Sequence, residues 1–133
     1  MIVADASWIA ALRDPNDGHH DAAVEINREI ADEDALLHPV TLAECLVAPA
    51  RLGALSDATS RLRASLEVPD MDREAPERWA SLRAETGLRL PDAIVLDIAL
   101  NHNARAIATF DARVAAAAKQ HGLEILGQPN PSP

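Results

Sequence analysis

The sequence predicts an α/β fold of three layers, with a short central parallel sheet of about four to five strands flanked by helices. Short apolar segments typical of buried strands alternate along the chain with longer segments whose apolar residues recur at helical spacing. This alternation is typical of a parallel sheet covered on both faces. The chain has 133 residues, of which 48% are hydrophobic, so one domain with a substantial core is expected.

The first half of the chain is predicted to contain two strands and four helices. Residues 2–4 and 35–38 are short apolar runs expected to be strands, and Pro39 ends the second. Apolar side chains at helical spacing, with turn residues between the segments, predict the helices. They cover residues 5–12, 20–30, 41 to about 49, and 55–66. Pro49 disturbs the end of the third helix.

The second half is predicted to continue the alternation and to end in a tail. A brief strand is expected at 67–68, followed by a helix that begins near Pro76 and ends at Gly87. The helix from Pro91 to about residue 100 is apolar on most sides, which predicts a central position. A strand at 105–109, an alanine-rich helix from 111 to 122 and a strand at 123–126 follow. We therefore expect a domain over 1–126 and a loose proline-rich tail over 127–133.

Composition excludes several classes of function. The net charge of −9 argues against a nonspecific nucleic-acid coat, because phosphate contacts need Lys and Arg, but not against an enzyme with a bound cation. The single cysteine, Cys45, excludes an intramolecular disulfide and lies in an apolar run, which indicates a buried, inert thiol. No apolar run approaches the roughly 20 residues of a membrane span. Met1 leads directly into the first strand, so we expect no signal peptide and a cytoplasmic location.

Four acidic residues are predicted to meet at one edge of the sheet. Asp5 and Asp111 follow predicted strands, whereas Glu44 and Asp92 lie in the first turns of predicted helices. Ligands in such folds bind beyond the carboxyl ends of the strands. Carboxylates gathered there repel one another, and a hard divalent cation removes that penalty. The pattern favours Mg²⁺, with Mn²⁺ as a substitute, and the absence of a histidine pair at ligand spacing argues against zinc.

Each of these acids also has an ordinary role at a helix start. Asp5 and Asp111 are N-cap candidates. Residues 41–44, Thr-Leu-Ala-Glu, match a capping box with Glu44 as its third helical member. Asp92 is favoured by the helix dipole. Spacing alone therefore leaves a metal site and four helix caps open.

Four short motifs resemble those of PIN domains. They are residues 3–7 (Val-Ala-Asp-Ala-Ser), 41–44, 90–93 (Leu-Pro-Asp-Ala) and 109–111 (Thr-Phe-Asp). The match runs in order over residues 1–126, and the compact length resembles the VapC toxins of bacterial toxin–antitoxin pairs.

The resemblance implies a metal-dependent endoribonuclease that acts as a toxin. It implies that Asp5, Glu44, Asp92 and Asp111 hold the metal, with Ser7 and Thr109 as supporting hydroxyls. It also implies a homodimer, an RNA substrate of the transfer or ribosomal class, and a cognate antitoxin that holds the enzyme inactive. The antitoxin is expected to place a basic segment, with an arginine, at the acidic edge.

Three further charged residues have expected roles that follow from their positions in the sequence. Arg13 and Arg89 lie near the acidic edge and are candidates for RNA phosphate contacts, with structural salt bridges as the alternative. Asp97 lies five residues after Asp92, which turns it about 140° away, so we expect a solvated or partner-facing side chain.

Two competing functions are considered. A receiver or phosphatase domain needs a second acid near Asp5 and a lysine after a late strand, but Ser7 stands at the Asp-x-Asp position and Lys119 falls inside a helix. A PIN-like module that binds without cutting would not need all four acids. Trp8 is left open between the core and a dimer contact.

Overall fold

The central sheet of the computed structural model, which describes residues 1–127, has four parallel strands in the order β2-β1-β3-β4. Ile2 pairs with Ala35 on one side and with Ala106 on the other, which fixes the register. The predicted fold class is confirmed, although the brief strand expected at 67–68 is a single bridge between Leu36 and Glu67. The strands are β1 (Ile2–Ala4), β2 (Ala35–Leu36), β3 (Ala106–Ala108) and β4 (Glu124–Leu126).

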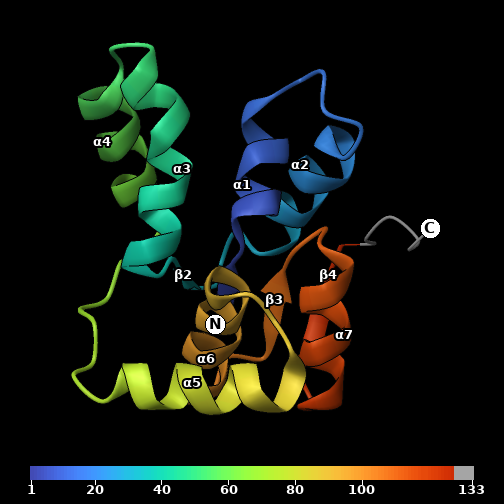
Figure 1. The fold of residues 1–133 in the computed structure, drawn as a ribbon. Helices are drawn as coiled ribbons and strands as arrows, with labels where there is room; N and C mark the ends of the chain where they lie inside the picture. Colours follow the sequence, from blue (N-terminus) through green and yellow to red (C-terminus); the bar gives the residue numbers. More distant parts are fainter. Residues whose placement is uncertain (128–133) are drawn as a thin grey trace.

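Helices cover both faces of this sheet (Figure 1). Successive strand side chains point to opposite faces, so Ile2 and Ala4 join one core cluster and Val3 joins the other. The first cluster packs α1 (Ala6–Arg13), α2 (His20–Glu29) and α3 (Pro39–Arg51), with α4 (Leu55–Ser65) at its margin. The second packs α5 (Ala75–Thr86), α6 (Leu90–Asn101) and α7 (Ala112–Gln120).

Helix α3 begins earlier than the sequence predicts. His38 is its N-cap, and the ring Nδ1 accepts a hydrogen bond of 3.0 Å from the Val40 amide. Pro39 occupies the first helical turn, where its missing N–H has no helical partner to lose. Pro49 lies inside the helix, which continues to Arg51. The predicted end of α5 is confirmed, because Gly87 caps it with a left-handed φ of 73°.

Two side chains are placed in the core by contacts far along the chain. Trp8 is 2% exposed and its Nε1 donates to the Ala23 carbonyl at 3.2 Å, so it is a core residue. The expectation of a solvated or partner-facing Asp97 is wrong, because this side chain is buried. Its carboxylate accepts from Arg78 Nε at 2.9 Å and from Trp79 Nε1 at 3.0 Å, and this neutralisation permits its burial.

No helix within residues 1–127 combines the length and apolar character needed to cross a membrane. The tail predicted for 127–133 lies outside the described residues from position 128 onward.

Candidate active site

The sheet topology brings the ends of β1 and β3 together. The chain passes from β1 to β2 on one side and later returns to β3 on the other side of β1. This reversal of strand order is where parallel sheets commonly form a ligand crevice. Asp5 directly follows β1, and Asp111 follows β3 by three residues, so both acids lie at this crevice.

The carboxylate of Asp5 is held by two hydroxyl groups and not by helix amides. Asp5 occupies the N-cap position of α1, but its side chain makes no capping hydrogen bond. Its Oδ2 accepts from Ser7 Oγ and from Thr109 Oγ1, each at 2.7 Å, and the residue is 7% exposed. Asp5 is therefore the N-cap residue of α1 by position, as predicted, but its side chain does not supply the capping hydrogen bond. Because both hydroxyls act on Oδ2, Oδ1 is left for another partner.

Asp111 does cap a helix. Its Oδ1 accepts from the amides of Arg113 at 2.8 Å and Val114 at 3.2 Å, at the start of α7. Its own amide donates to Thr109 Oγ1 at 3.0 Å. The cap interpretation is confirmed here, but it occupies one of the two carboxylate oxygens.

Glu44 and Asp92 come from helices on opposite faces of the sheet. Glu44 lies in the second turn of α3, so the capping-box interpretation is wrong because His38 takes the N-cap position. Asp92 lies in the first turn of α6, where the helix dipole favours a carboxylate. It is 6% exposed, and its Oδ2 accepts from Arg89 Nε at 3.3 Å.

The four carboxylates influence one another electrostatically. Loss of hydration raises the pKa of Glu44, and the charges of Asp5 and Asp92 raise it further. Loss of hydration likewise raises the pKa of Asp92, with added repulsion from Asp111 and Asp5. Arg89 opposes both shifts. The structure thus places all four predicted acids in one negative field that is only partly neutralised by the chain.

The donor chemistry of this field fits a hard cation. Among residues 1–127, no three His, Cys, Asp or Glu side chains converge closely enough to form a ready-made metal cage. Mg²⁺ does not require such a cage, because it usually keeps several waters and takes one or two carboxylates directly. The four carboxylates offer only oxygen ligands, which is the donor type that Mg²⁺ and Mn²⁺ prefer.

The two arginines chosen from the sequence have different surroundings. Arg89 forms the salt bridge with Asp92, and its side chain is 68% exposed. Arg13 is exposed at the end of α1, and its positive charge has a lowering effect on the pKa of the Cys45 thiol. Burial raises the pKa of the Cys45 thiol to about 11, consistent with the predicted inert cysteine.

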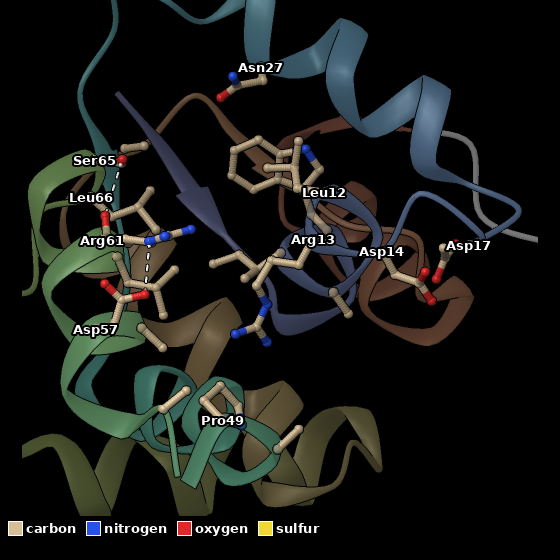
Figure 2. Close-up of a pocket in the computed structure, with 18 of the residues that line it drawn as sticks. Leu12, Arg13, Asp14, Asp17, Asn27, Pro49, Asp57, Arg61, Ser65 and Leu66 are labelled. Atoms are coloured by element: carbon tan, nitrogen blue, oxygen red, sulfur yellow. Dashed lines mark hydrogen bonds and ion pairs between the residues drawn. The ribbon is translucent and has the colours of Figure 1, made fainter. Parts of the chain in front are cut away.

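A groove that the sequence did not reveal runs between α1–α2 and α3–α4. Its volume is about 960 Å³. Figure 2 shows Leu12 and Arg13 on one wall and Arg61 and Leu66 on the other. Apolar side chains, among them Ile9 and Leu12, lie beneath an exposed charged rim. Because the lining comes from four separate helices, no local pattern marks it.

Residues 2–125 match the PIN domain family. Comparison with curated protein sequences finds no match.

The fold is shared with several solved structures. A toxin–antitoxin complex from Klebsiella pneumoniae aligns with a TM-score of 0.71 and 19% identity, over 87% of this chain and 91% of that chain. VapC20 from Mycobacterium tuberculosis, a toxin that cleaves the sarcin–ricin loop, aligns with a TM-score of 0.70 and 20% identity, over 88% and 95%. VapBC2 from Rickettsia felis, bound to a promoter DNA fragment, aligns with a TM-score of 0.69 and 16% identity, over 94% and 97%.

Proposed function

The chain belongs to the PIN-domain family, and from this premise we propose that it is a Mg²⁺-dependent endoribonuclease that acts as the toxin of a toxin–antitoxin pair. The observation that carries the proposal is the shared field of Asp5, Glu44, Asp92 and Asp111 at the strand-order reversal. The names of the similar structures, which include an RNA-cleaving toxin and toxin–antitoxin complexes, support the class of activity.

Each residue of the site has a proposed role. Asp5, Asp92 and Asp111 would hold the cation, directly or through water, and Glu44 would complete the site. Ser7 and Thr109 orient Asp5 by fixing Oδ2, so that Oδ1 would remain available as a ligand. The chemistry that a bound Mg²⁺ supplies is activation of an attacking water and stabilisation of charge on the phosphate. Mn²⁺, which also accepts oxygen ligands, would substitute for it.

The exposed arginines would assist RNA binding. The largely exposed Arg89 side chain would meet a phosphate beside Asp92, and Arg13 would contact the RNA backbone farther along α1. Transfer or ribosomal RNA is the proposed substrate class, and a cytoplasmic location is part of the same proposal. Since water is the nucleophile, an RNA with a deoxyribose at the cleaved position should still be cut when bound. Complete resistance of that substrate would indicate attack by the 2′-hydroxyl instead.

The direct test is cleavage of total cellular RNA by the purified protein, with Mg²⁺, with EDTA, and with Asp92→Asn. We expect discrete fragments that require Mg²⁺ and a loss of at least about 100-fold in rate for Asp92→Asn, the scale on which positioning of catalytic groups matters. Asp21→Asn, an exposed carboxylate in the first turn of α2, is the matched control and should cut normally. Cleavage that survives both EDTA and Asp92→Asn would contradict the proposed chemistry.

The groove between α1–α2 and α3–α4 is the proposed docking surface for the antitoxin. An amphipathic helix fits such a groove, with apolar side chains on its floor and charges on its rim. None of the four carboxylates lines the groove, but two of its helices lead to them, because Asp5 directly precedes α1 and Glu44 lies one turn before Ala48 on α3. A bound segment would therefore be able to place an arginine at the carboxylates.

Leu52 allows this docking surface to be tested without disturbing the core. It lines the groove and is 82% exposed. In cells that produce the chain with its paired antitoxin, Leu52→Asp should restore growth inhibition. Met71→Asp, which is 56% exposed and outside the groove lining, should remain protected. Protection of both variants would place the antitoxin elsewhere.

A homodimer is part of the proposal, on the basis of the family resemblance. Sedimentation velocity of the purified chain should give about twice the monomer mass of 14.2 kDa. A monomer at micromolar concentration would contradict it.

A further inference from the structure

Phe110 lies between two residues of the candidate site, and its ring is enclosed. It is 7% exposed and stacks on His19, with ring centroids 4.3 Å apart and an interplanar angle of 10°. The backbone of His19 is held by a hydrogen bond of 2.8 Å from its amide to Asp17 Oδ1. The Phe110 amide donates to Ser7 Oγ at 2.9 Å, so ring and backbone are both tied to the α1 side of the site.

Gly127 packs against the same segment from the end of β4. Its φ is +110°, a conformation that side-chain-bearing residues rarely adopt. A Cβ at this position would lie 2.6 Å from the Thr109 carbonyl oxygen and 3.1 Å from Cε1 of the Phe110 ring. Thr109 cannot withdraw freely, because its amide donates to the Leu126 carbonyl at 3.1 Å. Any side chain at 127 must therefore displace either residues 109–110 or Gly127 itself.

We propose that Gly127 and His19 are positioning residues that clamp Phe110 and thereby fix the carboxylates of Asp5 and Asp111. Thr109 orients Asp5 through its hydroxyl and receives the Asp111 amide, so a shift of this segment moves two proposed metal ligands together. The consequence for Mg²⁺ rests on the proposed function, whereas the clamp itself rests on the packing alone. The end of β4 and the connection before α2 are thus part of the site's support.

The glycines of the chain provide a matched pair of variants. Gly122→Ala introduces a methyl group at a φ of +79° with no atom within 4 Å, so it carries backbone strain without a clash. Gly127→Ala adds the clash. We expect Gly127→Ala, and not Gly122→Ala, to shift the NMR signals of the Phe110 and Asp111 amides. It should also weaken Mg²⁺ binding in calorimetry by about 10- to 100-fold, the range seen when support of metal ligands is lost.

The stack on His19 gives a second test that avoids glycine altogether. His19→Ala removes the ring and should weaken Mg²⁺ binding by about 2- to 10-fold, as expected for a lost aromatic pair. His19→Phe keeps a stacking ring and should restore the wild-type affinity and the Asp111 amide shift. A purely structural role would lower the melting temperature of His19→Ala without changing either readout.

The possible results separate the clamp from the proposed function. The clamp is overturned if the NMR signals of the Phe110 and Asp111 amides are unchanged in both Gly127→Ala and His19→Ala. Residue 127 and the connection before α2 would then have changed without affecting the site. If the amide signals shift in the variants but the wild-type protein binds no Mg²⁺, the clamp is supported and the proposed metal site is refuted. If Gly127→Ala does not fold, the His19 pair decides the question.

Discussion

At the scale of single residues, Asp92 combines burial with like charges in its surroundings. Both effects raise its pKa, which means that its ionised form is disfavoured in the folded protein. Asp92→Asn keeps the shape and removes the charge, and the lost contact with the exposed Arg89 is worth little. We expect the variant to melt at a higher temperature than wild type in EDTA at neutral pH, with each kcal/mol worth roughly 2–8 °C. Scanning calorimetry measures this, and a lower melting temperature would contradict it.

Addition of Mg²⁺ should reverse that order. A cation that binds only the folded state stabilises it in proportion to the logarithm of its concentration over Kd. Wild type and the surface variant Asp21→Asn should therefore gain melting temperature with increasing Mg²⁺, while Asp92→Asn gains little. Equal gains in all three proteins would show that the cation binds away from Asp92.

At the scale of elements, Asp97 joins α5 to α6. Its carboxylate is 7% exposed, and Arg78 is shared between it and Asp72. Asp97→Ala should lower the free energy of unfolding by about 2–3 kcal/mol. This is less than the 3–5 kcal/mol typical of a broken buried pair, because Arg78 keeps Asp72 and some solvent contact. Urea unfolding with an unchanged m-value measures the loss.

An exposed ion pair provides the control for this prediction. In α4, Asp57 Oδ2 lies 3.1 Å from Arg61 Nε, and the two side chains are 68% and 80% exposed. Asp57→Ala should cost less than about 1 kcal/mol. Similar losses in the two variants would mean that Asp97 does not carry the α5–α6 contact.

At the scale of the whole molecule, one ion cluster joins the amino ends of the strands. Arg105 Nε donates to Glu33 Oε1 at 2.7 Å, and Arg105 Nη1 donates to Glu124 Oε2 at 3.1 Å. The Met1 amino group lies 3.3 Å from Glu33 Oε1. These residues precede or begin the four strands. Charges of both signs are therefore paired at the amino edge of the sheet, whereas the carboxylates at the carboxyl edge are only partly neutralised.

This cluster predicts a loss of stability in acid. Hydrogen bonds from Arg105 lower the pKa of Glu33 from 4.5 to about 2. A lowered carboxyl pKa stabilises the fold fully above pH 4.5, and the contribution is lost as the pH falls toward 2. Glu33→Gln should lower stability at pH 7 and flatten the decline between those values, whereas Glu29→Gln, at the exposed end of α2, should not. Unfolding curves at several pH values test this, and high salt should reduce the difference.

The sequence by itself determined the order of the elements and the position of the acids relative to the strands. Helical spacing and short apolar runs reflect which side chains of a segment are buried, so α6, the end of α5 at Gly87 and the strands predicted at 2–4 and 123–126 could be recognised from the local sequence. The expected crevice for Asp5 and Asp111 followed from the rule for parallel sheets.

Only the tertiary structure decided which polar groups meet. Asp97 is buried because Arg78, 19 residues away, neutralises it, and Asp5 is oriented by Thr109, 104 residues away. Helix α3 begins at the His38 cap and not at the capping box that ends at Glu44. The close contact of Gly127 with residues 109–110 arises because β4 lies beside β3. These outcomes depend on contacts between segments that are distant in the sequence, and a local pattern does not specify which distant segments pack together.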